Sequence, residues 1–200
     1  MKKLRWGVIG AGGIADRRTI PGMMLAKNAE LIAVMDINAE QVEKLRQKYG
    51  AKRGYTKEED LLADPEVDAV YIATPHITHA ELSIAALEAG KPVLCEKPMA
   101  IDPESLAAVL AAAKRCGSLF LEGYMYRWHP QTAKLLELLR RNAVGEINLI
   151  ESAMGFAAKY NPADRLFNPA LGGGAVWDIG GYPLSMAMLV AGAALGTDPA

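Results

Sequence analysis

Runs of β-branched and aliphatic residues alternate with runs rich in Ala, Leu, Glu and Lys through the first 124 residues of the chain. The first kind of run is typical of strands and the second of helices. Strands are predicted over residues 5–9, 30–35, 51–55, 68–73, 92–95 and 119–124. Strands separated by helices form parallel, doubly wound sheets with right-handed crossovers. The sequence therefore predicts an α/β fold whose sheet has the strand order 3-2-1-4-5-6.

Several helix boundaries carry capping signals. Asp102-Pro103 is typical of an N-cap followed by proline at the first helical position, and Gly117 is typical of the residue that follows a last turn. A helix is predicted over residues 39–49, and Pro21 is expected to bend or end the first helix. Two threonines precede a glutamate by three positions, which is capping-box spacing: Thr56 with Glu59, and Thr78 with Glu81.

The pattern changes near residues 120–130, where the alternation of short strands and helices stops. Beyond this boundary the sequence predicts a helix over residues 130–142, a long strand over 146–156, a loop over 157–173 and a helix over 177–191. The predicted strand is longer than any strand before it. The boundary is therefore a change of architecture and not a flexible tether.

The composition is that of an ordinary globular protein, with 51% hydrophobic residues, 22% charged residues and a formal net charge of −1. Because no face is forced to be basic, we expect neither a nucleic-acid nor a membrane partner. Two cysteines are too few for a disulfide framework. The longest apolar stretch, residues 183–196, is too short to cross a bilayer as a helix. We therefore expect a soluble, cytoplasmic protein.

The segment Gly10-Ala11-Gly12-Gly13-Ile14-Ala15 fits the pattern G-x-G-x-x-A between a predicted strand and a predicted helix. Gly10 permits a tight turn, Gly12 lets backbone N–H groups approach a pyrophosphate, and Ala15 keeps the helix close to the sheet. The start of the helix directs positive partial charge toward the phosphates. A glycine-rich turn without a ligand is the alternative, which this context disfavours. The segment predicts a Rossmann dinucleotide site.

Asp36 ends the second predicted strand, about 20 residues past this turn. A carboxylate there can accept both ribose hydroxyls of NAD and repel a 2′-phosphate. The alternative is a solvated Asp36 that caps the next helix, although Asn38 could do that capping instead. Asp36 therefore predicts NAD as the preferred cofactor, with NADP as the other choice.

Two polar segments follow adjacent strands: Ala73-Thr74-Pro75-His76 and Glu96-Lys97-Pro98. Open α/β sheets bind ligands at the carboxyl ends of their strands. The Lys97 ammonium could hold a substrate hydroxyl or stabilise an alkoxide, and a surface lysine behind a buried strand is the alternative. His79, in the first turn of the next helix, either lines the cofactor pocket or has a packing or capping role. The histidines lack metal-site spacing, so no metal is expected.

Asp178 and Tyr182 are four residues apart, which places them on one face of a predicted helix. Tyr182 could carry a proton if its pKa fell well below the ordinary value of about 10. Lys97 and an oxidised nicotinamide are a plausible source of that change. Asp178 would oppose it, so we assign Asp178 to orienting Lys97 or the substrate. A structural tyrosine with an aspartate cap is the alternative.

Several segments together resemble the Gfo/Idh/MocA oxidoreductase family. They are the glycine turn, Ala73-Thr-Pro-His-Ile-Thr-His79, Cys95-Glu-Lys-Pro98, Glu122-Gly-Tyr-Met-Tyr-Arg-Trp-His-Pro-Gln131 and Gly172-Gly-Gly-Ala-Val-Trp-Asp-Ile-Gly-Gly-Tyr182. The resemblance implies hydride transfer between NAD(P) and a carbinol carbon of a sugar, polyol or trans-diol. It also implies an NAD(P)-binding Rossmann domain over residues 1–122 and part of an α/β domain with an open sheet over 123–200.

The resemblance assigns roles to single residues. Lys97 matches the family's catalytic lysine, and Asp178 and Tyr182 match its Asp and His/Tyr pair. With tyrosine at 182 and the segment Met-Tyr-Arg-Trp-His-Pro-Gln, the sequence is most similar to the aldose (xylose-type) dehydrogenase and dimeric dihydrodiol dehydrogenase branch. The predicted cofactor-binding residues are Gly10, Gly12, Gly13, Ile14, Asp36, Thr74, Pro75, His79, Glu96, Lys97 and Arg127.

The chain departs from the family pattern in sequence and in length. Asp36-Ile37-Asn38 stands where NADP-dependent relatives in that branch often have Ser-Arg, and His76 stands where Asn is usual. Family members normally continue well beyond this length, so the resemblance implies a C-terminal truncation that removes most of the usual homo-oligomer interface. The alternative function is a truncated, non-catalytic dinucleotide-binding module or a gene fragment.

Overall fold

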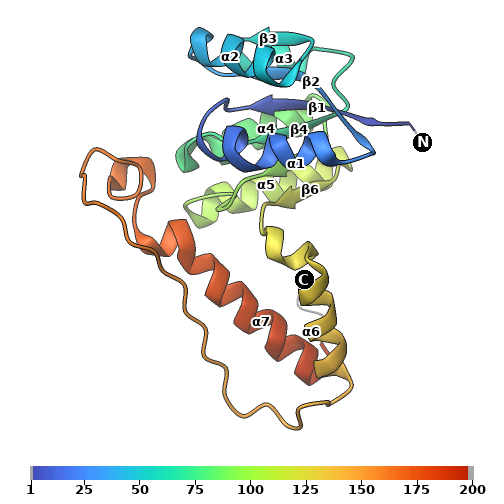
Figure 1. Cartoon of the computed structure of the whole chain (residues 1–200), viewed down its shortest axis with the longest axis vertical. Coiled ribbons are helices and arrows are strands. Elements are labelled where there is room, and N and C mark those ends of the chain that lie inside the picture. Colours follow the sequence, from blue (N-terminus) through green and yellow to red (C-terminus); the bar gives the residue numbers. More distant parts are fainter. Residues whose placement is uncertain (1, 198–200) are drawn as a thin grey trace. The chain divides into compact units, whose positions relative to one another are not determined.

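Six parallel strands form one sheet in the order β3-β2-β1-β4-β5-β6 (Figure 1). The strands are β1 Leu4–Ile9, β2 Ala29–Met35, β3 Arg53–Tyr55, β4 Ala69–Ile72, β5 Val93–Cys95 and β6 Phe120–Glu122. The computed structural model describes residues 2–197, and these divide after Gly123 into two units. The predicted fold class and strand order are confirmed.

Helices cover both faces of this sheet, as a fully buried parallel sheet requires. They are η1 Ala15–Thr19, α1 Ile20–Leu25, α2 Ala39–Tyr49, α3 Glu58–Leu62, η2 His76–Thr78, α4 His79–Glu88 and α5 Pro103–Cys116. One apolar cluster contains buried residues of α3, α4 and α5, and the other contains buried residues of η1, α1 and α2. Between Trp6 and Gly7 the β1–β2 register skips Ile32, so that Leu31 and Val34 both face the second cluster.

Two helices have the predicted caps. Asn38 Oδ1 accepts hydrogen bonds from the backbone N–H groups of Glu40 (3.0 Å) and Gln41 (3.3 Å), so Asn38 caps α2. Asp102 accepts a hydrogen bond of 2.7 Å from Ser105 N at the start of α5, and Gly117 ends that helix in the left-handed conformation. These signals are local, which is why the sequence alone specifies them.

Both capping-box predictions are wrong. Helix α3 begins at Glu58 with Lys57 as its N-cap, one residue after Thr56. The short helix η2 begins at His76, so Thr78 already has helical dihedral angles when α4 begins. The Thr78 Oγ1 does not cap the helix. It lies 2.9 Å from Pro75 O and 2.8 Å from Thr74 Oγ1. An extended N-cap conformation is therefore not available to Thr78.

Pro21 does not end the first helix. Residues 15–19 form the π-helical stretch η1, and α1 continues through Pro21 to Leu25. The N–H of Ile20 bonds to Ala15 O, five residues back. Because proline cannot donate an i→i−4 hydrogen bond, the wider turn ahead of Pro21 lets the helical run proceed.

The second unit is helical where the structure is regular. Its elements are η3 Met125–Trp128, α6 Pro130–Arg140, η4 Pro169–Leu171, η5 Val176–Gly180 and α7 Gly181–Leu195, and α6 packs against α7. The prediction of a strand over residues 146–156 is wrong. These residues have no regular secondary structure, and Figure 1 shows them as an irregular loop. Strand geometry depends on ladder hydrogen bonds, and none of the described strands pairs with this segment.

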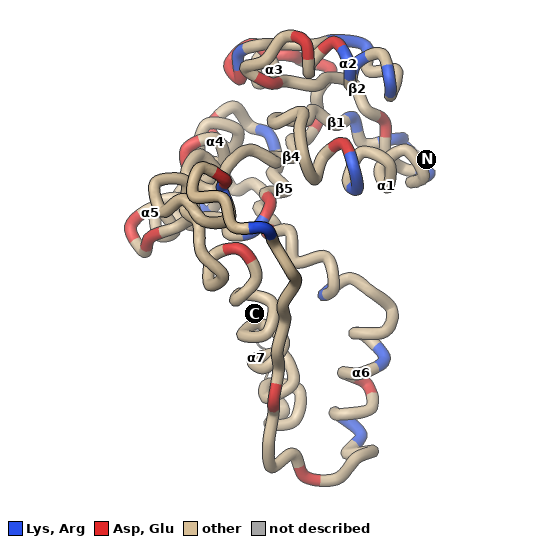
Figure 2. The backbone as a smooth tube through the Cα atoms, turned by 60° about the vertical axis from the view of Figure 1, so that its left-hand side comes forward, with Lys and Arg blue, Asp and Glu red and all other residues tan. Residues whose placement is uncertain are grey.

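One helical segment within residues 2–197, Pro169–Leu195, is long and apolar enough to cross a membrane by length and composition alone. It has 27 residues and a mean hydropathy of 1.3, so it begins well before residues 183–196, the stretch predicted from the sequence to be too short. The tube of α7 carries no charged residue in Figure 2. Only 22% of its apolar stretch is buried, although the segment also contains Asp178, which is buried and paired with Arg165.

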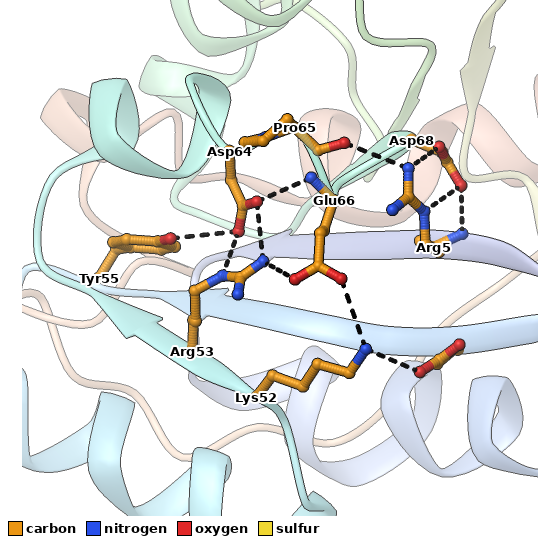
Figure 3. Close-up of polar contacts among 9 residues, drawn as sticks. Arg5, Lys52, Arg53, Tyr55, Asp64, Pro65, Glu66 and Asp68 are labelled. Carbon is orange, nitrogen blue, oxygen red and sulfur yellow. Dashed lines mark hydrogen bonds and ion pairs between the residues drawn. The ribbon is translucent and has the colours of Figure 1, made fainter.

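A polar network joins the amino ends of the strands, opposite the edge where ligands bind (Figure 3). Arg53 at the start of β3 contacts the carboxylates of Asp64 (2.7 Å) and Glu66, and Tyr55 donates to Asp64 at 3.1 Å. The Arg53 guanidinium lowers the pKa of Asp64. Because the Asp64 side chain is only 2% exposed, this network has a structural role at the base of the sheet.

Candidate functional site

The glycine turn lies against the carboxyl end of β4. Gly10 has φ +96°, and a Cβ there would lie 2.7 Å from Ala73 C and 2.9 Å from Thr74 N. Its N–H donates to Met35 O at 2.8 Å, at the end of β2. Only glycine satisfies both the positive φ and this close approach. The turn therefore brings the ends of three neighbouring strands together at one edge of the sheet.

Beside this contact the turn is open. Apart from the adjoining chain, no described residue has an atom within 4 Å of the place where a Cβ on Gly12 or Gly13 would be. A hollow of about 280 Å³ lies against these glycines, and Arg17 and Lys44 are among its lining residues. Ala15, by contrast, is fully buried, which keeps the helical run close to the sheet. Bare glycine backbone at the start of a helical run is what a dinucleotide pyrophosphate requires, and Arg17 and Lys44 add positive charge beside Asp16, so the residues fit that group.

Asp36 connects the end of β2 to this turn. Its Oδ2 accepts a hydrogen bond of 2.8 Å from Ala11 N, and its Oδ1 accepts one of 2.9 Å from Asn38 N. The sequence left either Asp36 or Asn38 as the cap of α2. The structure shows that Asn38 is the cap. A carboxylate has about four lone-pair sites, so both oxygens can still accept from ribose hydroxyls.

His79 ties together the loops that follow β4 and β5. The side chain is fully buried, with Nε2 2.9 Å from Thr74 O and Nδ1 2.7 Å from Pro98 O. Burial lowers the pKa of His79, while the two carbonyl oxygens act in the opposite sense. The buried imidazole lies between two loop carbonyls, and a neutral ring can donate to only one of them, so His79 acts on the site through the backbone of those loops.

Lys97 follows β5 directly and is half-buried. The peptide bond between Lys97 and Pro98 is cis. Glu96 N donates to Ile72 O at 2.9 Å, and Met99 N donates to Glu122 Oε1 at 2.8 Å. The loop that carries Lys97 is therefore fixed to β4 on one side and to the end of β6 on the other. This arrangement places Lys97 at the carboxyl end of β5.

In the second unit, Asp178 and Tyr182 have different surroundings. Asp178 lies in the π-helical stretch η5, and its Oδ1 accepts a hydrogen bond of 3.1 Å from Arg165 Nη1. Sequence reasoning missed Arg165, because it lies on the loop before η5 and fits no motif. The partner compensates the buried carboxylate charge of Asp178.

Tyr182 belongs to an aromatic cluster with Tyr124 and Tyr126. Its ring centroid lies 5.2 Å from that of Tyr124 at an interplanar angle of 81°, and 6.1 Å from that of Tyr126. A Cβ on Gly181 would overlap the Tyr124 hydroxyl, so glycine is required beside Tyr182. The cluster fixes the phenol of Tyr182 on the first turn of α7.

The predicted residues thus fall into two groups. The first unit contains the glycine turn, Asp36, Thr74, Pro75, His79, Glu96 and Lys97, and all of these lie at or beside the carboxyl ends of its strands. The second unit contains Arg127 in η3, Asp178 and Tyr182. Among residues 2–197, no three His, Cys, Asp or Glu side chains gather as a metal site requires. Burial raises the pKa of the Cys95 thiol to about 12, so that thiol is inert at neutral pH.

Comparison with known families assigns both units. The oxidoreductase family with an NAD-binding Rossmann fold matches residues 4–124, and the GFO/IDH/MocA C-terminal domain matches residues 132–195. A trans-1,2-dihydrobenzene-1,2-diol dehydrogenase from Danio rerio is 34% identical over 188 residues, which are 94% of this chain and 56% of that protein.

Solved structures of oxidoreductases also resemble this chain in fold. An aldose–aldose oxidoreductase from Caulobacter crescentus, complexed with glycerol, has a TM-score of 0.82 at 29% identity and covers 98% of this chain and 58% of that one. A mutant 3-ketoreductase from Actinomadura kijaniata, in complex with TDP-benzene and NADP, has a TM-score of 0.81 at 30% identity, covering 95% and 58%. The chain therefore spans less than two thirds of these relatives. With both units matched, the chain belongs to the Gfo/Idh/MocA family of NAD(P)-binding oxidoreductases.

Proposed function

We propose that this protein is an NAD-dependent dehydrogenase that interconverts a carbinol and a carbonyl group on a sugar, polyol or trans-diol. The observation that carries the proposal is Lys97, held at the ligand-binding edge of a sheet whose glycine turn is open for a dinucleotide. A dinucleotide-binding module needs no fixed ammonium there. The diol and aldose oxidoreductases among the relatives support this substrate class.

The first unit supplies the residues that would hold the dinucleotide. The backbone of residues 10–15 would hold the pyrophosphate, and Asp36 the adenosine ribose. Thr74, Pro75 and Glu96 lie at or beside the ends of β4 and β5, the side where we place the nicotinamide. Arg127 in the second unit is a further candidate. A nicotinamide ring bound there would exchange a hydride with the carbinol carbon.

The protein's own groups would handle the proton. We assign to the Lys97 ammonium a hydrogen bond to the reacting oxygen, which stabilises negative charge as it develops. We assign the proton to Tyr182, which would accept it from that oxygen as a phenolate during oxidation and return it as a phenol during reduction. We assign Asp178 to orienting Lys97 or the substrate, and its hydrogen bond from Arg165 would hold its carboxylate in place.

The test is steady-state NADH formation by this chain with a panel of aldoses, inositols and trans-diols. We expect turnover with at least one member of the panel and its loss in Lys97→Ala, while NADH binding persists. A chain that binds no NADH would contradict the proposal altogether.

A second function, a dinucleotide-binding module without turnover, is favoured by one observation. Residues 146–156 have no strand partner in the described chain, and the side chains of Leu149 and Phe156 are 75% and 57% exposed. Tight NADH binding with no turnover on the whole panel would favour this module over the dehydrogenase.

A further inference from the structure

A buried tyrosine connects the cofactor turn to the loop that carries Lys97. Tyr71 lies in β4 with only 1% of its surface exposed. Its hydroxyl lies 2.7 Å from Glu96 Oε1 and 2.9 Å from Thr19 Oγ1. Thr19 is the last residue of η1, and Glu96 directly precedes Lys97. The side chains of Thr19, Tyr71 and Glu96 therefore form a hydrogen-bonded chain.

The direction of the hydrogen bonds in this line is fixed. Ionised Glu96 can only accept, so the single phenolic proton of Tyr71 goes to Glu96. The Thr19 hydroxyl must then donate to the oxygen of Tyr71. Burial and the charge of Glu96 both raise the pKa of Tyr71, so its phenol stays protonated and remains a donor.

Glu96 is also confined on its other side. A Cβ on Gly123 would lie 3.3 Å from Glu96 Cα and 3.4 Å from Glu96 Oε2. The bare Gly123 thus accommodates one carboxylate oxygen while Tyr71 bonds the other. Packing alone would be served equally well by phenylalanine at position 71, so the hydroxyl has a separate role.

We propose that Tyr71 is a positioning residue for the nicotinamide half of the site. It fixes Glu96, and with it the backbone of Lys97, relative to the helical run that receives the dinucleotide phosphates. The inference rests on the proposed function, because it takes the loop after β5 as the nicotinamide side.

The test compares two ligands of the whole chain. ADP-ribose carries the adenosine and both phosphates, whereas NADH adds the nicotinamide. In Tyr71→Phe we expect the Kd of NADH to rise at least fivefold and the Kd of ADP-ribose to change less than twofold. The fluorescence emission maximum of bound NADH should also move toward that of free NADH.

Tyr49→Phe is the matched control. Tyr49 packs on the same apolar cluster, and its hydroxyl lies 2.6 Å from Asp16 O and 2.8 Å from Asp16 Oδ1, on the same helical run. This variant loses a comparable hydrogen bond but has no link to Glu96, so the two Kd values should change by the same factor. Thr19→Val should repeat the Tyr71→Phe pattern more weakly, because it removes the second link only.

Equal changes for both ligands in Tyr71→Phe, or none, would overturn the inference and leave the proposed function intact. Failure of the unaltered chain to bind NADH would overturn both. If Tyr71→Phe does not fold, Thr19→Val decides the matter through the same ratio of Kd values.

Discussion

Asp36 is held by two backbone N–H groups, and this determines where its charge lies. The hydrogen bond from Ala11 fixes Oδ2 against the glycine turn, and the one from Asn38 fixes Oδ1 at the start of α2. A fixed carboxylate cannot turn away from a 2′-phosphate. We therefore propose that Asp36 is the side chain that decides between NAD and NADP.

We predict that the chain binds NADH more tightly than NADPH. Repulsion between the Asp36 carboxylate and a 2′-phosphate at close range should cost at least about 1–2 kcal/mol. Asp36→Ser should narrow the preference. Fluorescence titration with both reduced cofactors measures it, and equal Kd values in the unaltered chain would contradict the assignment.

Lys97 and Tyr182 are predicted to serve chemistry more than cofactor binding. Lys97→Ala and Tyr182→Phe should each lower kcat by at least about 10²-fold, the scale of proton transfer and electrostatic stabilisation. NADH affinity should change by less than about tenfold. Tyr124→Phe is a control that keeps the aromatic cluster. Near-normal turnover in Tyr182→Phe would remove Tyr182 from the mechanism.

His79 should make the stability of the chain depend on pH. Burial lowers its pKa below the ordinary value of about 6.5, so folding holds the ring neutral. Its contribution is present above that ordinary value and is lost as the pH falls through the interval down to the folded pKa. Urea unfolding between pH 7.5 and 5 should show this loss.

His79→Gln should flatten that pH dependence, and His129→Gln should not, because His129 is exposed. Parallel curves for all three proteins would show that the neutral His79 does not matter for folding.

At the scale of elements, the network at the amino ends of the strands should control acid stability. Arg53 lowers the pKa of Asp64, and Arg5 lowers the pKa of Asp68 to about 2. Both carboxylates stabilise the fold above their ordinary pKa of about 4, and this stability is lost as the pH falls through the lowered pKa of each, which for Asp68 is about 2.

Asp64→Asn is the variant that tests this network. It should lower the urea midpoint at pH 7 and flatten the loss of stability in acid. Glu43→Gln is the control, because the pair of Glu43 with Arg46 is exposed and screened by water. An unchanged midpoint in Asp64→Asn would show that the network does not stabilise the sheet.

The elements differ in how far the sequence could predict them. The strand order followed from the right-handed crossovers of parallel sheets. The helices α2 and α5 and the positions of Asp36 and Lys97 followed from local patterns, because each depends on neighbouring residues. The capping box at Thr56 does not form because α3 begins at Glu58 with Lys57 as its N-cap. The capping box at Thr78 does not form because the chain is already helical from His76. The bonds from Tyr71 to Glu96 and from Arg165 to Asp178 could not be predicted, since they depend on tertiary packing.

Two of the helical runs that carry residues of the site contain a π-helical stretch near their start. The stretch η1 precedes α1 and carries Thr19, and η5 precedes α7 and carries Asp178. π-helical turns are rare in proteins, but where they occur they are often at functional sites. No periodicity in the sequence indicates them, because the extra residue per turn is stabilised by packing around it.

For the whole molecule, exposed apolar side chains of the second unit should govern its behaviour in solution. On α7 the side chains of Leu184 and Met188 are 64% and 57% exposed. Contiguous apolar surface promotes association. Analytical ultracentrifugation should therefore show self-association that increases with concentration, and Leu184→Lys with Met188→Lys should reduce it.

Leu110→Lys is the control for that experiment, because Leu110 on α5 is 51% exposed but belongs to the first unit. It should leave the association unchanged. A monodisperse monomer at all concentrations would contradict the prediction.

The central position of β1 has a consequence for synthesis on the ribosome. Trp6 in β1 pairs with Ala69 in β4, so about 60 residues separate the two partners. At about 5–20 residues per second, translation needs roughly 3–12 s to supply the second partner. During that interval Val8 and Ile9, which end up fully buried, have only one neighbouring strand available. The nascent chain therefore presents an apolar strand to chaperones before its sheet can close around it.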